Sequence, residues 1–259
     1  MVSDAASADD LVGIVADLTV AFHDRVVIKG VNLKLRQGHL TVIIGRSGSG
    51  KTTLLRAFNR LNDYYPAAKS SGTLRLRFQD AWQDIYQDGV DLQELRRRVG
   101  MVFQNPNVLP LSVEKNITLP VQLVCGLSKK ACAGRLEEVL QQVGLWHEVK
   151  DRLRLPAALL SGGQQQRLCL ARTLALEPEF LLLDEPTANL DFRTAQDIEG
   201  LLLSLKERCQ ILVVSHSLTQ ARRLAEQLAV LKNGELSHLL TPAEFQQPEV
   251  WQQMIEDIF

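Results

Sequence analysis

The second half of the chain contains short runs that are almost wholly apolar, separated by segments with the spacing of amphipathic helices. The runs are FLLLD at 180–184, ILVVS at 211–215 and LAVL at 228–231. A strand without a polar face must be covered on both sides, and helices that connect parallel strands supply that cover. The sequence therefore predicts an α/β fold with a mostly parallel sheet.

The remaining segments extend this pattern in both directions. Strands broken by turns are predicted across 11–44, and TLRLRF at 73–78 alternates as a half-buried strand does, after a turn-rich stretch at 63–72. Further helices are predicted at 50–62, 92–99, 112–149, 162–178, 192–207 and 217–226, and further strands at 100–104 and 228–236. The long helical stretch between residues 104 and 178 interrupts the alternation and predicts a separate helical lobe.

Length, charge and apolar content argue against several classes of protein. The 259 residues carry a formal net charge of −1, so no basic excess favours nucleic acid as a partner. No apolar run approaches the roughly 20 residues that cross a bilayer, and the acidic start MVSDAASADD does not resemble a secretory signal. The protein is expected in the cytoplasm, and if it acts at a membrane, a partner must hold it there. Reduced thiols are expected for Cys125, Cys132, Cys169 and Cys209, which lack CxxC spacing.

A phosphate-binding loop is predicted at 45–52. GRSGSGKT fits G-x-x-x-x-G-K-[ST] and lies between a predicted strand and a predicted helix, which is the context that the motif requires. Glycines permit positive φ angles and a close approach of backbone N–H groups to phosphate, and the helix beginning near Gly50 adds unpaired N–H groups. Lys51 supplies charge for the terminal phosphates and Thr52 a hydroxyl for Mg²⁺. The alternative is a plain glycine–serine turn before a helix.

A second motif places two carboxylates at the end of a buried strand. FLLLDEP spans 180–186, so Asp184 ends the apolar run and Glu185 follows it. An aspartate there can hold the magnesium shell, and a glutamate one residue later can polarise a water for in-line attack on a γ-phosphate. Adjacent acids at a strand end are commonly only solvated, but the preceding apolar run and the upstream phosphate-binding loop favour catalysis.

A third motif, LSGGQQQR at 160–167, is another glycine-rich helix start suited to an anion. One chain therefore carries two phosphate-facing segments but only one loop with a lysine. We interpret this as a homodimer in which Ser161, Gly162 and Gly163 of each chain close over the nucleotide held by the other. A simple glycine-rich helix cap is the alternative.

These motifs occur in the order and spacing of the ATP-binding-cassette (ABC) ATPase family, which the chain resembles from about residue 11 to 255. The set also includes VFQNP with Gln104, NLD at 189–191 and VVSHS with His216. The resemblance implies a P-loop NTPase core with a mostly parallel sheet, an N-terminal antiparallel β subdomain and an inserted helical signature subdomain. It divides the domain (11–255) into a core at 11–104 and 178–240, a helical subdomain at 105–177 and a C-terminal helical tail at 241–259.

The resemblance also implies cofactors and roles. The cofactors are ATP and Mg²⁺, and the implied metal ligands are Thr52, Gln104 and Asp184. Gln104 would sense magnesium and the attacking water, His216 would contact the γ-phosphate, and Asp191 would lie across the dimer interface. The implied catalytic set is Glu185, His216, Gln104 and Lys51. The implied nucleotide-binding set is Phe22 as the adenine-stacking aromatic, with His23 as a competing candidate, and Gly45, Arg46, Ser47, Gly48, Ser49, Gly50, Lys51, Thr52, Thr53, Gln104, Asp184, Ser161, Gly162, Gly163, Gln164 and Asp191.

A closer resemblance is to the ATPase subunit of bacterial phosphate importers. It is carried by AFNRLNDYYP, ELRRRVGMVFQNPN, LWHEVKDRL and LSGGQQQRLCLARTLALEPEFLLLDEPTANLD. The chain departs from that group at NLDF (189–192), at Ser217 after the histidine, and in its ending EVWQQMIEDIF. The segment before the third motif, RLRLPAAL, lacks the glycine–glutamate loop typical of exporters, which favours import. Import of phosphate is expected, and another solute stays open.

A transporter ATPase needs partners that the sequence does not contain. Transmembrane permease subunits and, for an importer, a solute-binding protein are expected, with the chain peripheral on the inner face of the cell membrane. The apolar, proline-bearing segment 104–125 is the candidate groove for the permease, and a buried loop and helix is the alternative.

Two other classes of function are less consistent with the sequence. DNA-repair relatives of the family it resembles insert a long coiled coil between the phosphate-binding loop and the carboxylates, and the spacing from Lys51 to Asp184 is too short for one. Ribosome-acting relatives usually carry two cassettes and a charged linker, and the near-neutral charge of this chain also argues against nucleic acid as a partner. A non-hydrolysing scaffold would have a damaged site, yet Lys51, Asp184, Glu185 and His216 are all present.

Overall fold

The structure is a computed structural model that describes residues 10–188 and 190–258. Its residues divide into two units. Unit 1 comprises residues up to Leu95 together with Lys206 onward, and unit 2 comprises Arg96–Leu205. Each unit carries part of the predicted machinery. None of the described helices is long and apolar enough to cross a bilayer.

Unit 1 contains an antiparallel sheet of four strands in the order β2-β1-β4-β5. The strands are β1 (Leu11–Phe22), β2 (Arg25–Arg36), β4 (Ala68–Phe78) and β5 (Ala81–Asp84). The strands predicted within 11–44 and at 73–78 are confirmed. The turn-rich prediction for 63–72 is wrong from Ala68 onward, because Ala68 pairs with Phe22 and β4 follows β1 along its length. Tertiary pairing overrides the weak strand propensity of the lysine, serines and glycine there.

Unit 1 also contains the central strands of a second sheet. β3 (Thr41–Ile44) pairs in parallel with β8 (Gln210–Val214) and with β9 (Gln227–Lys232). β10 (Glu235–Leu240) returns antiparallel to β9. The prediction of a single strand across 228–236 is therefore wrong. Asn233 and Gly234 have φ angles of 52° and 86°, and two consecutive left-handed residues make the tight hairpin turn that an Asn-Gly pair favours.

The helices of unit 1 are short. They are α1 (Lys51–Ala57), the 3₁₀ helix η2 (Leu61–Tyr64), α8 (Leu218–Leu224), α9 (Pro242–Phe245) and α10 (Pro248–Ile258). α1 ends before the predicted residue 62 because Arg60 has a φ of 56°, which breaks the helical path and starts η2. The α2 helix (Leu92–Arg98) spans the boundary between the units, and the helix predicted at 92–99 is confirmed.

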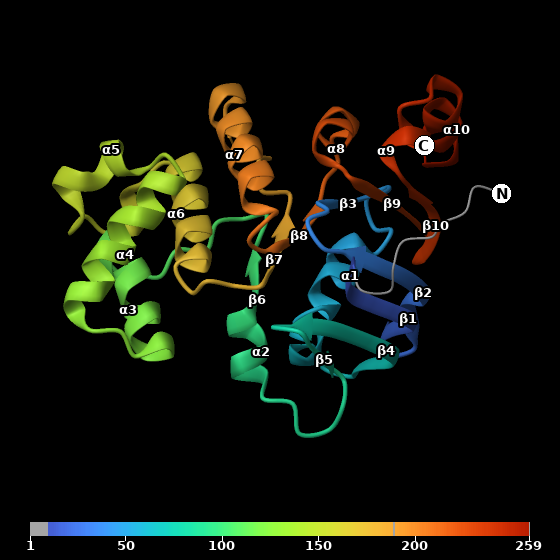
Figure 1. The fold of residues 1–259 in the computed structure, drawn as a ribbon, viewed down its shortest axis with the longest axis horizontal. Helices are drawn as coiled ribbons and strands as arrows, with labels where there is room; N and C mark the ends of the chain where they lie inside the picture. The colour runs from blue at the N-terminus through green and yellow to red at the C-terminus, as the bar shows by residue number, and fades with distance from the viewer. Residues whose placement is uncertain (1–9, 189, 259) are drawn as a thin grey trace. The chain divides into compact units, whose positions relative to one another are not determined.

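Unit 2 contains a parallel strand pair and a helical lobe. β6 (Val99–Val102) pairs with β7 (Phe180–Asp184). The helices are α3 (Val113–Cys125), α4 (Lys129–Gln142), α5 (Trp146–Val149), η3 (Lys150–Arg152), η4 (Ala157–Leu159), α6 (Gly162–Leu174) and α7 (Phe192–Leu205). α3, α4 and α6 pack on one another, as Figure 1 shows, around buried side chains that include Ile117, Leu140 and Leu168. The helices predicted across 112–149 and 162–178 are confirmed, although α6 stops at Leu174 before a turn at Glu177.

Candidate functional site

The glycine loop of unit 1 follows the buried strand β3. Its glycines occupy positions where a side chain would clash or where φ is positive. Gly45 has a φ of 154°, and a Cβ there would lie 2.1 Å from the Leu231 carbonyl oxygen. Gly50, just before α1, has a φ of 102°, and its Cβ would lie 2.8 Å from Ile28. Gly48 has a φ of 78° with open space around it. The loop therefore needs glycine for packing at Gly45 and Gly50 and for conformation at all three.

Lys51 lies beneath this loop with only 5% of its surface exposed. Its Nζ donates hydrogen bonds to the carbonyl oxygens of Gly45 (2.8 Å) and Arg46 (2.9 Å). A buried ammonium is stable only where such partners or an anion compensate it. The ammonium is therefore already held at the loop, where it can exchange carbonyl oxygens for phosphate oxygens.

The other polar side chains of the loop fit a phosphate as well. Ser49 Oγ is buried and has no hydrogen-bond partner among the described residues, so it can serve an incoming acceptor or donor. Arg46 and Ser47 are exposed at the loop's tip, and Thr52 and Thr53 are half-buried in the first turn of α1. The Thr53 carbonyl accepts a hydrogen bond from Asn62 Nδ2 (2.9 Å), which fixes this turn against η2.

His216 lies near the same edge of the sheet as the loop. The Ser215 N–H donates to the Ile43 carbonyl oxygen (3.1 Å), so the chain leaves β8 beside the end of β3. Ser215 is buried and its hydroxyl donates to Gln220 Oε1 (2.7 Å), while Ser217 caps α8 by accepting from the Gln220 N–H. Carboxyl ends of parallel strands meet at one edge, and the structure thus brings exposed His216 to the edge where Gly45 begins the loop.

A pocket of about 290 Å³ adjoins the tip of the loop. Its lining combines the loop and the β9–β10 turn with Glu256 and Ile258 from α10. α10 is the atypical ending of the sequence, and it is fixed to unit 1 by Trp251, whose ring lies 6.3 Å from that of Phe245 and 5.3 Å from the Arg222 guanidinium. The ending is therefore an ordered part of the surroundings of the loop. The predicted helical tail at 241–259 gave no indication of its position.

The aromatic candidates for adenine lie in the antiparallel sheet of unit 1. Phe22 ends β1, and its ring meets Tyr65 edge-on at 5.6 Å between centroids. Tyr65 also receives a hydrogen bond from Arg56 Nη1 (2.6 Å). His23 has a φ of 54° in the turn that follows. Phe22 thus belongs to an aromatic pair. Its partner Tyr65 lies in the segment NDYYP and matches no nucleotide-binding motif of the sequence.

In unit 2, the two predicted carboxylates follow β7 in different environments. Asp184 is buried at the end of the strand, and Glu185 is half-buried with a φ of 49°. A left-handed φ is strained for a residue with a side chain and is common at functional sites. Gln104 Nε2 donates to Glu185 Oε2 (3.1 Å). The structure therefore brings together two residues that the sequence separates by 81 positions.

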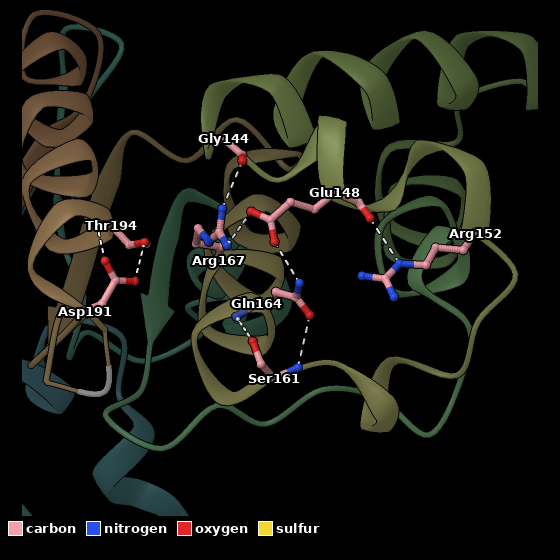
Figure 2. Close-up of polar contacts among 8 residues, drawn as sticks. All are labelled: Gly144, Glu148, Arg152, Ser161, Gln164, Arg167, Asp191 and Thr194. Carbon is pink, nitrogen blue, oxygen red and sulfur yellow. Dashed lines mark hydrogen bonds and ion pairs between the residues drawn. The ribbon is translucent and has the colours of Figure 1, made fainter.

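The signature segment of unit 2 begins α6 with a complete capping box, drawn in Figure 2. Ser161 Oγ accepts from the Gln164 N–H (3.3 Å), and Gln164 Oε1 accepts from the Ser161 N–H (3.0 Å). Ser161 and Gly162 are exposed and Gly163 is half-buried. A capped helix start with exposed small residues leaves backbone N–H groups accessible to an anion.

Asp191 immediately precedes α7 in unit 2. Its carboxylate accepts hydrogen bonds from the backbone N–H groups of Arg193 and Thr194 (3.1 Å each) and from the Thr194 hydroxyl (2.6 Å). The Thr194 hydroxyl is the main reason that the pKa of Asp191 lies below its usual value. Asp191 thus caps a helix. Asn189, the first residue of the NLD motif, lies outside the described residues.

The donor chemistry of these segments fits a nucleotide phosphate and Mg²⁺. The glycine loop offers a buried lysine and an unpartnered serine hydroxyl, both suited to phosphate. Across residues 10–188 and 190–258, no cluster of three or more His, Cys, Asp or Glu side chains could hold a metal ion. Mg²⁺ commonly binds through one or two protein oxygens together with water and substrate phosphates. Thr52 in unit 1 and Asp184 in unit 2 each carry an oxygen of that kind.

Comparison with known proteins supports the same reading. A model of the ABC transporter family matches residues 28–188. The phosphate import ATP-binding protein PstB of Pyrobaculum aerophilum is 47% identical over 222 residues, which cover 85% of this chain and 86% of that protein. Its counterpart in Thermotoga maritima is 42% identical, with 86% of this chain and 87% of that protein covered.

Solved structures of ATP-binding cassettes share the fold. The ATP-binding cassette MJ0796, in a dimeric post-hydrolysis structure bound to ADP and Pi, is 30% identical with a TM-score of 0.76, covering 89% of this chain and 98% of that one. The cbiO1 protein of Clostridium perfringens, part of the ABC transporter complex cbiONQ, is 27% identical with a TM-score of 0.76, covering 95% of each chain. The predicted fold class is confirmed, and the chain belongs to the ABC transporter family.

Proposed function

We propose that this chain is the ATP-binding and ATP-hydrolysing subunit of an importer of inorganic phosphate. The observation that carries the ATPase function is the glycine loop closed over buried Lys51, at the sheet edge that also holds His216. The substrate rests on the relatives, which are named phosphate import ATP-binding proteins and are 41–47% identical over most of this chain. The predicted ABC domain at 11–255, with its core, helical subdomain and tail, is part of the proposal.

The loop residues bind the triphosphate. Lys51 donates from Nζ to the terminal phosphates, Ser49 and the backbone N–H groups from Gly45 to Thr53 bind the others, and Phe22 stacks on adenine beside Tyr65. Thr52, Asp184 and Gln104 would hold Mg²⁺, which would neutralise charge on the phosphates when bound. His216 donates to the γ-phosphate. These assignments are supported by the burial of Lys51 and by the absence of side chains at Gly45, Gly48 and Gly50.

Glu185 acts as the general base. The Glu185 carboxylate accepts a proton from the attacking water. Gln104 orients this carboxylate through the hydrogen bond from Nε2 to Oε2. The electron pair of the broken Pγ–O bond leaves with ADP, and the water oxygen stays on inorganic phosphate. The strained φ of Glu185 supports a functional reason for its conformation.

Two copies of the chain share each nucleotide. Ser161, Gly162, Gly163 and Gln164 of one copy face the phosphates held by the other copy's loop, and Asp191 lies near the interface. ATP thus closes the dimer and hydrolysis reopens it. The dimer drives a transmembrane permease that works with a phosphate-binding protein, and the chain is peripheral on the inner face of the cell membrane.

The departure at Ser217 does not weaken the assignment to phosphate. Ser217 caps α8 by accepting from the Gln220 N–H (3.2 Å). Asparagine, which the phosphate-importer group that the chain resembles usually has at this position, caps a helix equally well. The change therefore preserves the local structure after His216. The atypical ending forms α10 within unit 1, and the identity of the solute is tested by phosphate uptake.

The test has one arm for the ATPase and one for the solute. Glu185→Gln should bind MgATP, form a dimer in gel filtration and hydrolyse at least about a hundredfold more slowly than wild type. In a bacterium that lacks its phosphate-importer ATPase, the wild-type gene should restore uptake of radioactive phosphate, and Glu185→Gln should not. Hydrolysis without phosphate uptake would indicate another solute. Absence of an ATP-dependent dimer would contradict the shared nucleotide site.

A further inference from the structure

A glutamate outside the sequence motifs holds the side chains of the signature helix. Glu148 lies on the short helix α5. Its Oε2 accepts from Gln164 Nε2 (2.7 Å), and its Oε1 pairs with Arg167 Nη2 (2.7 Å). Figure 2 shows the carboxylate between these two residues of α6. Both contacts lie within unit 2, and both partners are in the LSGGQQQR segment.

The carboxylate decides which way the Gln164 amide points. An amide carries an acceptor and a donor end of nearly the same shape. Because an ionised carboxylate only accepts, the NH₂ end of Gln164 must face Glu148, and the Oε1 end must face the Ser161 N–H. Without an acceptor at that place, the amide could rotate and abandon the capping box. Glu148 therefore fixes the half of the capping box that Gln164 contributes.

The same geometry sets the polarity of Ser161. Its Oγ accepts a hydrogen bond from the Gln164 N–H, so the hydroxyl proton remains to be donated. A hydroxyl that is exposed, at a helix start, and oriented as a donor suits a phosphate oxygen. The path from Glu148 through Gln164 to Ser161 thus ends at the atom that would meet the anion.

Neighbouring groups stabilise the negative charge of the Glu148 carboxylate. The Arg167 side chain is only 11% exposed and also donates from Nη1 to the Gly144 carbonyl oxygen (2.9 Å). Partial burial raises the pKa of Glu148, but the bonds from Gln164 and Arg167 outweigh this and lower it below its usual value. Arg152 Nε donates to the Glu148 carbonyl oxygen (3.0 Å), which steadies the backbone there. Glu148 is therefore ionised and fixed in place.

We propose that Glu148 is a positioning residue for ATP hydrolysis, a role that rests on the proposed function and goes beyond it. It acts through Gln164 on Ser161, in the copy that closes over its partner's nucleotide. Its loss should weaken closure and turnover without weakening nucleotide binding by the loop of the same chain, because that loop belongs to unit 1.

The test exchanges donor and acceptor between positions 148 and 164. Glu148→Gln alone leaves an amide NH₂ facing either Gln164 or Arg167, and Gln164→Glu alone sets two carboxylates against each other. Each should lower kcat by about tenfold or more and leave the KM for ATP within about twofold. In the double variant, the amide introduced at position 148 can donate to the new carboxylate at position 164 and accept from Arg167, so at least half of the lost kcat should return.

Matched controls separate positioning from simple folding. Glu137→Gln changes a glutamate that accepts from Gln141 Nε2 (3.0 Å) on the exposed face of α4, and it should retain wild-type kcat. Thermal unfolding and the stoichiometry of ATP binding report the folded fraction of each variant. A merely structural Glu148–Arg167 ion pair would not be restored by Gln164→Glu, so rescue supports positioning.

Dimerisation distinguishes failure of this inference from failure of the proposed function. In the Glu185→Gln background, Glu148→Ala should weaken MgATP-dependent dimerisation by about tenfold in analytical ultracentrifugation. Two results would overturn the role of Glu148 while leaving the ATPase function intact. One is equal MgATP-dependent dimerisation with and without Glu148→Ala. The other is a kcat of the Glu148→Gln, Gln164→Glu double variant that is no higher than that of the single variants. If the Glu185→Gln parent forms no dimer with MgATP, the shared-site function itself is wrong.

Discussion

Gln104 Nε2 donates a hydrogen bond of 3.1 Å to Glu185 Oε2, joining the segments that follow the parallel strands β6 and β7. The two residues lie 81 positions apart, yet the pairing of Val102 with Leu183 brings their strand ends together. The carboxylate proposed as general base is thus oriented by an amide that an adjacent strand positions.

Removal of this amide should impair the chemical step. Gln104→Ala removes that hydrogen bond from Glu185 and one of the proposed Mg²⁺ ligands, so we expect kcat to fall about tenfold or more and the KM for MgATP to rise. Steady-state ATPase kinetics measure both. Gln141→Ala removes a glutamine that donates to Glu137 on α4 and serves as the control. An unchanged kcat in Gln104→Ala would contradict the orienting role.

Gly45 and Gly48 of the loop should respond differently to alanine. Gly45→Ala forces a Cβ to 2.1 Å from the Leu231 carbonyl oxygen, whereas Gly48→Ala meets nothing within 4 Å. Gly48→Ala should cost about 1–2 kcal/mol for its left-handed backbone. Gly45→Ala should cost more, since overpacking adds about 1–3 kcal/mol. Urea unfolding compares them, and equal losses would contradict the close contact with β9.

The cap of α7 should contribute stability that depends on pH. Hydrogen bonds from Thr194 and Arg193 lower the pKa of Asp191, so the contribution is present above the unfolded carboxyl pKa of about 3.9 and is lost as pH falls through the lower folded value. Asp191→Ala should therefore reduce the midpoint of thermal unfolding at pH 7. The difference from wild type should shrink below about pH 4. A difference independent of pH would contradict the charged cap.

The cysteines should differ sharply in reactivity. Cys125 is exposed, whereas Cys132, Cys169 and Cys209 are buried. Burial raises the pKa of Cys169, and it raises that of Cys209 to about 11, so few thiolates form there at pH 8. A thiol reagent at pH 8 should label one cysteine rapidly in the folded protein and the rest only after unfolding. Rapid labelling in Cys125→Ser would contradict this order.

Sequence patterns predicted helices and strands well where the pattern lies within the element itself. The apolar runs that became β7 and β8 are buried along their whole length, and Ser161 and Gln164 form the capping box that their spacing favours. One error occurred where pairing with a distant strand decided the outcome, and the other where a local Asn-Gly turn interrupts a predicted strand. Ala68 joined β4 because Phe22 lies opposite, and the run 228–236 folded back at Asn233 and Gly234.

Sequence alone was enough to identify the glycine loop with Lys51, the strand ending in Asp184 and Glu185, and the signature at Ser161, because each motif is contiguous. Tertiary structure alone revealed that Glu148 holds Gln164 and Arg167, that Gln104 holds Glu185, and that α10 lines a pocket at the loop. Contacts between distant residues depend on how helices and strands pack, and a hydrogen bond requires its partners within about 3.5 Å. No spacing along a chain specifies such distances.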